Sequence, residues 1–382
     1  MSLPKVTLLY TNGNLLQDVG DIDGIAAIIG TGTTAGLLNK PKTVYNLDDA
    51  IAQGYTLLAE PAMYRHLQEF YNEVAGNKEL KIMIVANTVT LTQMADNTNS
   101  TNGAKVLTNE FPGRVRLLAI YRTPPGGYTG GANFIDADVV SALPNALTFC
   151  QARLAENAPL RMIIEGRVQN PAAANTLTPN TSTNGFTAVL LGGTLNDGSA
   201  SVGLLLGRAV KYGAHIKIGK VANGPLSVST IYIGDKLIKD VVNLATLHGN
   251  GFISFMTYPQ KAGYFFGIDR MASNDDFRLL AYGRVVDKAA VIAVAVFTED
   301  LEGEVDVDAD GKIASYEVTH LEERIKQQIQ VAMGDQISGE PSIYINPDQN
   351  IINTSRLTLK GRIRPKGYKS FIDFELGITA TT

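Results

Sequence analysis

Short apolar segments alternate with longer segments of helical periodicity, and this alternation constrains the fold more than any other feature of the chain. We expect buried strands at residues 24–29, 80–86, 115–121, 162–165 and 188–191. Segments with a helical pattern lie between or after them, at residues 47–74, 137–157 and 203–212. Strands that alternate with helices favour a mixed or parallel sheet covered by helices. The sequence therefore predicts an α/β fold, a mixed sheet flanked by helices.

The C-terminal part opens with an apolar strand at 264–268 and a helix start signal. Ser273 and Asp276 fit the pattern of an N-cap with an acidic residue three positions later, which predicts a helix over residues 274–296. This helix is apolar almost all round after Ala289. We therefore expect its second half to be buried on both sides.

A second helix is predicted from a capping box formed by Thr319 and Glu322. Gly334 lies just beyond its end as a stop signal. Its apolar residues recur at four-residue spacing: Leu321, Ile325, Ile329 and Met333. A strand follows at 343–345. Two helices and short strands predict an α+β C-terminal domain.

The C-terminal residues show the alternation of two strands. Basic residues alternate with Leu357, Leu359 and Ile363, and a later run alternates Ile372, Phe374, Leu376 and Ile378 with Asp373 and Glu375. A four-residue loop over 365–368 sets Leu359 opposite Phe374 and Lys360 opposite Asp373, and the pattern alone favours this closing hairpin. The alternative is that the last strand leaves its own subunit and pairs with an exposed sheet edge elsewhere.

The N-terminus carries a similar candidate arm. Val6, Leu8 and Tyr10 share one face of a short strand that ends at the turn Asn12-Gly13. Ten extended residues reach about 33 Å, far enough to touch a neighbouring subunit.

Glycines after the first strand suggest a nucleotide-binding loop. Gly30, Gly32 and Gly36 follow the apolar run at 24–29. A dinucleotide site needs a helix directly after its glycines, with the helix N-terminus on the pyrophosphate. The few residues between Gly36 and Pro41 cannot form that helix, so we expect the glycines to serve a tight loop.

Residues 306–317 match the pattern of a calcium-binding loop, with acids, a turn glycine and a glutamate at the twelfth position. The flanks favour another interpretation. Glu304, Asp306 and Asp308 alternate with valines, as in a strand, and the predicted helix starts after Glu317. A hairpin that turns at 308–311 is the simpler hypothesis, and a calcium-binding α/β module remains the alternative.

Composition excludes several function classes. The net charge of −4 does not indicate a nucleic-acid partner. No apolar run approaches the roughly 20 residues of a membrane helix, so we expect no direct membrane insertion. The single cysteine, Cys150, and the absence of a signal-peptide pattern are consistent with a reducing cytoplasm.

Nothing in the sequence indicates an enzyme. The four histidines, at 66, 215, 248 and 320, lie far apart without metal-ligand spacing. No nucleophile motif stands out, although a dispersed triad leaves no sequence pattern. We therefore assign no catalytic residue, no metal site and no cofactor, and an unrecognised α/β enzyme is kept as a second alternative.

Two ordered sets of residues resemble contractile tail sheath proteins. The N-terminal set is Ala-Ile-Ile-Gly-Thr-Gly at 27–32, Leu-Leu-Asn-Lys-Pro-Lys-Thr-Val at 37–44 and the segment 47–54. The C-terminal set comprises Asp269-Arg270, Tyr282-Gly-Arg284, Asp287-Lys288, Gly311-Lys312-Ile313, Leu321-Glu322, Asn346-Pro347 and Pro365-Lys-Gly-Tyr. This order is similar to single-chain tail sheaths of phages and phage-like injection systems, in particular a Bacteroidetes-type branch.

The resemblance implies a structural subunit that polymerises helically around an inner tube and shortens to drive the tube through a membrane. Its partners would be other copies of itself, the inner tube protein, and baseplate and tail terminator proteins. It would reside in the bacterial cytoplasm during assembly and then in a virion tail or an assembled injection particle.

The resemblance also implies a division of the chain. Residues 1–20 and 370–382 would be arms that add strands to neighbouring subunits. Residues 21–262 would form the outer α/β domain with polar insertions, and residues 263–369 the inner domain. The helix at 320–333 would face the tube through Glu322, Glu323, Lys326, Gln327 and Gln330.

Overall fold

Six strands form the central sheet of the structure, a computed structural model that describes residues 24–376. The strands are β1 (Ala26–Gly32), β2 (Lys42–Val44), β3 (Leu80–Ala86), β4 (Leu117–Ile120), β5 (Arg161–Glu165) and β6 (Thr187–Leu190). Their order is β2-β3-β1-β4-β5-β6. All neighbours are parallel except β2, which pairs antiparallel with β3. The predicted mixed sheet is confirmed.

Helices cover both faces of this sheet. The elements are α1 (Leu47–Ala52), α2 (Pro61–Val74), α3 (Leu91–Met94), α4 (Ala104–Glu110), α5 (Ala137–Ala155) and α6 (Val202–Lys211). Helix α2 packs against α6, and both contact β1, whereas α5 contacts β5 and β6. The chain passes through α2 as it moves from β1 to β3, on one side of β1. It then passes through α4 and α5 as it moves to β4 and β5, on the other side of β1. Right-handed crossovers therefore place these helices on opposite faces. Coverage of both faces explains why the parallel strands read as continuous apolar runs.

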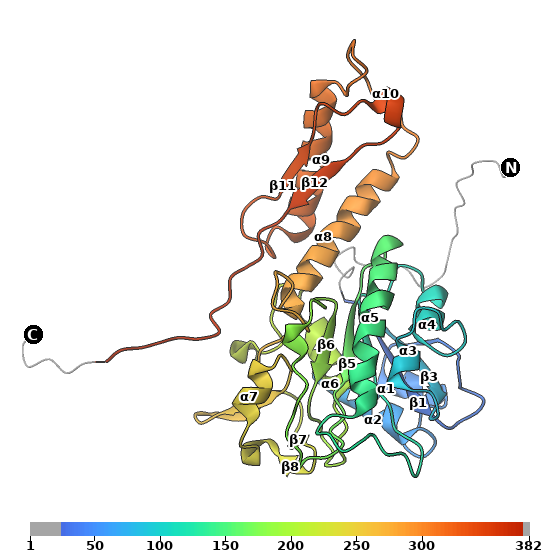
Figure 1. Cartoon of the computed structure of the whole chain (residues 1–382), viewed down its shortest axis with the longest axis vertical. Helices are drawn as coiled ribbons and strands as arrows, with labels where there is room; N and C mark the ends of the chain where they lie inside the picture. Colours follow the sequence, from blue (N-terminus) through green and yellow to red (C-terminus); the bar gives the residue numbers. More distant parts are fainter. Residues whose placement is uncertain (1–23, 377–382) are drawn as a thin grey trace, which may run out of the picture.

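Short elements extend the body beyond the edge strand β6. They are β7 (Tyr232–Ile233), β8 (Lys236–Leu237), α7 (Leu244–Gly249), β9 (Phe255–Tyr258) and β10 (Lys261–Phe266), with 3-10 turns at Pro179–Thr181, Val221–Asn223 and Ile238–Asp240. A β-bridge between Leu190 and Ile253 joins these short elements to β6. Figure 1 shows them on the side of the body away from β1.

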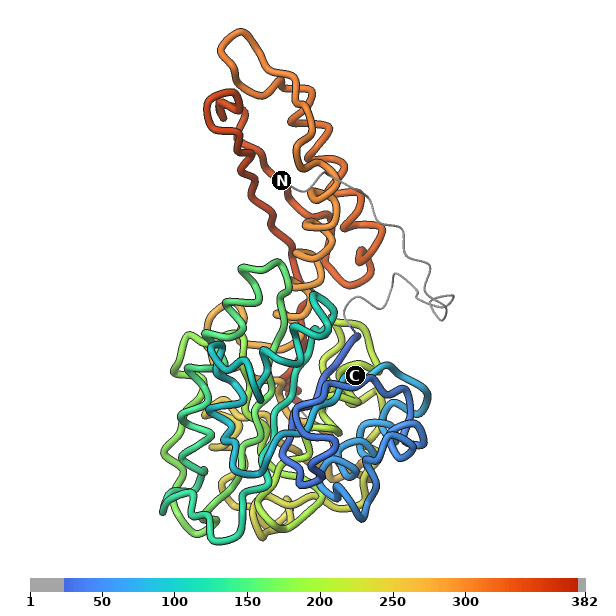
Figure 2. The backbone as a smooth tube through the Cα atoms, turned by 90° about the vertical axis from the view of Figure 1, so that its right-hand side faces the viewer, coloured from blue at the N-terminus to red at the C-terminus, as the bar shows by residue number. Residues whose placement is uncertain are grey.

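The C-terminal elements form a narrow part that projects from the body (Figures 1 and 2). They are α8 (Leu280–Thr298), α9 (Ser315–Met333), β11 (Ser342–Ile345), α10 (Ile351–Thr354) and β12 (Leu359–Arg362). The face of α9 that carries Ile325, Ile329 and Met333 is buried in a small core with α8 and β11. Within residues 24–376, no helix has the length and apolar character that crossing a membrane requires.

The predicted start and surroundings of α8 are wrong. The helix begins at Leu280, and the Ser273 hydroxyl instead accepts the N–H of Asp275 in a turn that precedes it. Residues 291–297 are mostly half-buried, and Ala295 is exposed. The apolar second half of α8 is therefore only partly covered within the described chain.

The start of α9 also differs from the prediction. The helix begins at Ser315, four residues before Thr319. The Thr319 hydroxyl donates to the Ser315 carbonyl oxygen at 3.1 Å, so it bonds within the helix and caps nothing. Its apolar face is buried as expected.

The predicted C-terminal hairpin is wrong as well. β12 pairs antiparallel with β11, so that Ile345 lies opposite Leu359 and Tyr344 lies opposite Lys360. Residues 367–376 form no strand and pair with no other strand of the described chain. Of the strand predicted over 356–363, residues 359–362 form β12, and its partner is the preceding strand rather than the following one.

Candidate assembly surfaces

The last described residues form an extended and exposed segment. Phe371, Ile372, Phe374 and Leu376 are 77–82% exposed. Figure 1 shows this segment leaving the molecule and running away from both parts. A run of four apolar side chains at such exposure is unusual on a monomer and marks a contact site. Ile378 of the predicted arm lies outside the described residues, as do Val6, Leu8 and Tyr10 of the N-terminal arm.

The segment leaves the body from a fixed point. The Tyr368 hydroxyl donates to the His215 carbonyl oxygen at 2.6 Å, and its ring stacks on Tyr282 with centroids 5.5 Å apart. Lys217 lies over the same ring and donates to the Ser370 hydroxyl at 3.3 Å. These contacts hold residues 368–370 on the body, so that the apolar residues begin directly after the anchor.

The β11–β12 hairpin presents two outer edges. Among the described residues, neither edge pairs with a further strand. Four basic side chains on or beside β12 are exposed: Arg356, Lys360, Arg362 and Arg364. An open edge is a template for pairing with another chain, and basic side chains there select against random partners.

The predicted tube-facing residues lie on one side of α9. Glu323, Gln327 and Gln330 are exposed, whereas Glu322 and Lys326 are half-buried. The Glu322 carboxylate accepts the N–H of Ile345 at 2.7 Å and so holds β11 against the helix. Lys326 donates to the Glu323 carboxylate at 2.6 Å. Sequence reasoning missed Val331, which is 78% exposed on the same helix.

Residues 306–314 form a tight turn, and residues 315–317 begin α9. Asp308 Oδ1 accepts the N–H groups of Asp310 and Lys312, each at 2.9 Å, and Val307 bridges to Ile313. Of the two strands predicted for this hairpin, only the single β-bridge between Val307 and Ile313 forms. Glu317 lies in the first turn of α9, contrary to the expectation that the helix starts after it. Within residues 24–376, no three His, Cys, Asp or Glu side chains gather as metal ligands.

The glycine-rich stretch plays a packing role. Gly30 and Gly32 belong to β1 rather than to a tight loop, so the expectation for them is wrong. A Cβ at Gly30 would lie 1.9 Å from the Tyr121 ring, and one at Gly32 would lie 2.4 Å from the Glu60 carboxylate. That carboxylate accepts the N–H groups of Thr33 and Thr34 at 2.9 and 2.6 Å. These N–H groups, which a phosphate would need, are therefore already bonded within the fold.

A buried polar cluster lies between α2 and the loop before α6. Glu69 Oε1 accepts hydrogen bonds from the hydroxyls of Thr194 and Ser201 at 2.6 and 2.8 Å. Burial, and secondly the charge of Arg65, lower the pKa of His66 to about 4. His66 is therefore neutral near pH 7, and the cluster ties the two helices together.

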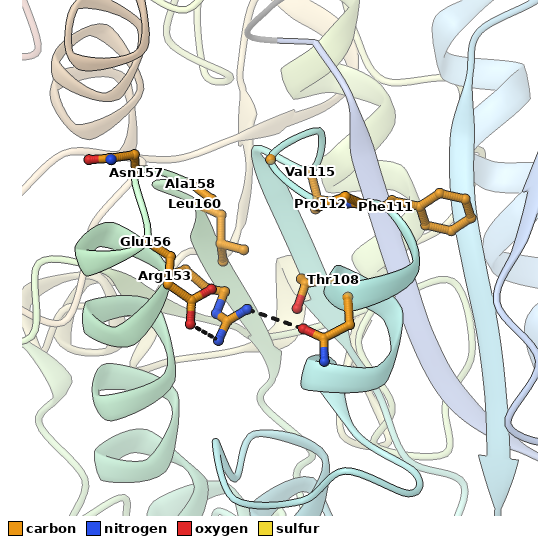
Figure 3. A pocket seen from close by; sticks show the side chains of 11 residues that line it. Thr108, Phe111, Pro112, Val115, Arg153, Glu156, Asn157, Ala158 and Leu160 are labelled. Carbon is orange, nitrogen blue, oxygen red and sulfur yellow. Dashed lines mark hydrogen bonds and ion pairs between the residues drawn. The ribbon is translucent and has the colours of Figure 1, made fainter. Parts of the chain in front are cut away.

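The described residues form a smaller and a larger cavity. The smaller, of about 220 Å³, lies between the ends of α4 and α5. Figure 3 shows Arg153 there, bonded to Glu156 at 2.7 Å and to Asn109 at 3.4 Å. The larger, of about 930 Å³, lies beside α7 and beneath the start of the C-terminal segment.

Solved structures of sheath proteins share this fold. A chain of the anti-feeding prophage helical sheath in the contracted state is 13% identical, with a TM-score of 0.60 and 99% of each chain covered. A chain of the contracted sheath complex of the extracellular contractile injection system PVC is 11% identical, with a TM-score of 0.61 over 100% of this chain and 98% of that one. The sheath tail protein of Desulfitobacterium hafniense is 10% identical, with a TM-score of 0.52 over 95% and 100%.

Sequence comparison identifies the family. No curated protein matches the chain. The N-terminal domain of DUF2586 matches residues 3–270, which is most of the sequence. The chain therefore belongs to the DUF2586 family and has the fold of contractile sheath proteins.

Proposed function

We propose that this chain is the subunit of a contractile sheath, a structural protein that polymerises helically around an inner tube and shortens to drive it through a membrane. The observation that carries the proposal is the fold match, which spans nearly the full length of both chains for sheaths of contractile injection systems. A match of this extent includes the projecting C-terminal part as well as the body. The role requires neither catalysis nor a cofactor.

The exposed C-terminal segment supports the proposal because it has the features of an inter-subunit arm. Its apolar side chains are not covered within the described chain, and they start directly after the anchor at Tyr368. Asp373 and Glu375 alternate with them. In our proposal residues 370–382 of one subunit add a strand along β12 of a neighbour, where these acids meet Lys360 and Arg362. Each opposite-charge cross-strand pair contributes roughly 0.2–1 kcal/mol.

The remaining assignments follow the same scheme. Residues 1–20 would be a second arm that presents Val6, Leu8 and Tyr10. Residues 21–262 would face outward and residues 263–369 inward, with α9 directed at the inner tube through Glu323, Gln327 and Gln330. Baseplate and tail terminator proteins would bind the ends of the polymer, in a phage tail or a phage-like injection particle. The Bacteroidetes-type branch stays a prediction.

Contraction would use two packings of the same folded subunit. The work would come from an extended lattice relaxing to a better-packed one while the arms keep neighbours attached. A rigid subunit suits this role, because strain is then transmitted to the interfaces rather than absorbed within the fold.

Truncation tests the arm mechanism. Chains that lack residues 1–12 or 371–382 should remain folded monomers by circular dichroism and size-exclusion chromatography, yet fail to form tubules under electron microscopy. Neither deletion removes a residue of the apolar core around the central sheet or of the small core between α8, α9 and β11. The matched control is Tyr45→Ala, which changes an exposed aromatic side chain directly after β2 rather than a residue of either arm, and which should polymerise normally. Full-length tubules from both truncated chains would contradict the mechanism.

A further inference from the structure

The stretch that follows β12 connects the projecting part to the body a second time. At its start, the Ser338 N–H donates to the Arg364 carbonyl oxygen at 2.7 Å. Pro365 forms a β-bridge with Ile337, which belongs to the small core of the projecting part. Figure 1 shows the chain then running from the hairpin down to the body before the C-terminal segment leaves. Residues 364–370 therefore form a strap whose first end is held by the projecting part.

The other end of the strap is held by the loop that follows α6. The Tyr368 hydroxyl donates to the His215 carbonyl oxygen at 2.6 Å. The Lys217 ammonium donates to the Ser370 hydroxyl at 3.3 Å. In the same loop, Ala214 is fully buried in the small core of the projecting part. The loop, the strap and the projecting part thus meet at one junction.

The strap crosses the first turn of α8 at this junction. The Tyr368 ring stacks on the Tyr282 ring with centroids 5.5 Å apart and an interplanar angle of 28°. Asp269 holds the same turn, because its carbonyl oxygen accepts the Leu280 N–H at 2.9 Å and its carboxylate accepts the Ala281 N–H at 3.2 Å. The strap therefore rests on the point at which α8 leaves the body.

Lys217 joins the strap to this turn electrostatically. Its ammonium lies 3.2 Å from the Asp269 carboxylate, and the two side chains are 11% and 1% exposed. Separation of such a pair is costly, because it would leave a buried charge without a partner. The same ammonium lies 5.4 Å from the centroid of the Tyr368 ring, whose face attracts cations. One lysine thus fixes the strap and the start of α8 relative to each other.

A second attachment removes a freedom that the first would leave. Two parts of a chain joined through a narrow contact are expected to move relative to each other. Here α8 is one connection between the body and the projecting part, and the strap is another. Tilting the projecting part would require opening the Lys217–Asp269 pair or the stack of Tyr368 on Tyr282.

We propose that the strap, residues 364–370, is a brace that fixes the angle between the projecting part and the body. The brace is a property of the single chain, whereas its use rests on the proposed sheath function. The exposed apolar segment starts at Phe371, directly after the strap. A neighbour that pulls on this segment would therefore load the body at Lys217 instead of peeling β12 from β11. A braced subunit passes strain on to its interfaces.

A distance measurement between two spin labels on the monomer tests the brace. The labels are attached at Gln151→Cys on α5 and Gln328→Cys on α9, both exposed positions, while the native Cys150 is buried. Double electron–electron resonance below the concentration at which tubules form should give one narrow distance distribution. Tyr368→Ala removes the stack and the hydroxyl bond, and should make the distribution at least about twice as wide.

Matched variants make the result specific. Lys217→Met keeps a long side chain without its charge and should also widen the distribution, which covers the case in which Tyr368→Ala does not fold. Tyr344→Ala removes an exposed aromatic side chain from β11 and should keep the wild-type width. Deletion of residues 371–382 leaves the strap in place and should keep that width too.

Two results would overturn the inference: a broad distribution in the wild-type chain, or the wild-type width in both Tyr368→Ala and Lys217→Met. Tubule formation by the wild-type chain is scored separately by electron microscopy. Tubules without a braced monomer would refute the brace and leave the sheath function standing. A braced monomer that never forms tubules would confirm the brace and contradict the sheath function.

Discussion

Arg161 and Asp287 join the central sheet to helix α8 through a bidentate ion pair. Arg161 Nε donates to Asp287 Oδ2 at 2.7 Å, and Nη2 donates to Oδ1 at 2.6 Å. Nη1 donates to the Gly185 carbonyl oxygen at 2.7 Å, and the guanidinium lies over the Phe186 ring. Arg161 lies on β5 and Asp287 lies on α8, so the pair holds the projecting C-terminal part at its base.

Removal of one partner should be costly because it leaves a buried charge unpaired. The side chains of Arg161 and Asp287 are 2% and 8% exposed. We predict that Asp287→Ala lowers the free energy of unfolding by about 3–5 kcal/mol, measured by urea denaturation. Glu323→Ala is the matched control, since it breaks the exposed pair with Lys326 and should cost less than about 1 kcal/mol. Equal losses for the two variants would refute the importance of the buried pair.

Acid should destabilise the body through His66. Its pKa is about 4 in the folded chain and 6.5 when unfolded, so the unfolded state binds the proton more tightly. Stability is therefore complete above pH 6.5 and falls as pH drops from 6.5 toward 4. At pH 5 the loss from this group is about 2 kcal/mol.

Urea denaturation of His66→Gln at pH 7.5 and pH 5 measures this contribution. The variant should lose less stability than the wild type between the two pH values, even if its stability at pH 7.5 is lower. His320→Gln, a substitution at an exposed position on α9, should keep the wild-type pH dependence. An unchanged pH dependence in His66→Gln would contradict the account.

Close packing explains Gly30. Because a Cβ there would overlap the Tyr121 ring, we predict that Gly30→Ala lowers the free energy of unfolding by about 1–3 kcal/mol or more. A Cβ added at Gly36 would meet no other atom within 4 Å, so Gly36→Ala should be nearly neutral. Thermal unfolding of both variants checks the difference, and equal melting temperatures would show that the strand relaxes around the extra methyl group.

The turn at 308–311 should be stabilised by its own hydrogen bonds. Asp308→Ala removes an acceptor for two backbone N–H groups and should cost about 1 kcal/mol. Thermal unfolding of the wild type with excess calcium or with a chelator should give the same midpoint. A calcium-dependent rise in the midpoint that Asp308→Ala abolishes would revive the calcium-binding alternative.

Local patterns predicted the α/β body well. The apolar runs at 80–86 and 162–165 coincide with β3 and β5 within one residue. A strand that is buried on both faces is apolar at nearly every position, so such a run marks it directly. Helix starts in the C-terminal part were predicted less well. Ser273 and Thr319 have the composition of caps, but their hydroxyls bond in a turn and within a helix. Composition does not distinguish these uses.

Contacts between distant segments could not be predicted. The alternation at 356–363 identifies a strand but not its partner, and β11 was as suitable as the run at 372–378. The larger cavity beside α7 gathers Lys220, Arg270 and Lys366 from separate parts of the chain. No local signal marks such a site, because its residues become neighbours only when α7, β10 and the C-terminal segment pack together.

Negative-stain electron microscopy of the purified, untagged full-length chain over rising concentration tests the central claim most directly. The sheath proposal predicts hollow, striated tubules of uniform diameter above a threshold concentration. Uniform small particles at every concentration, with or without added inner tube protein, would contradict it.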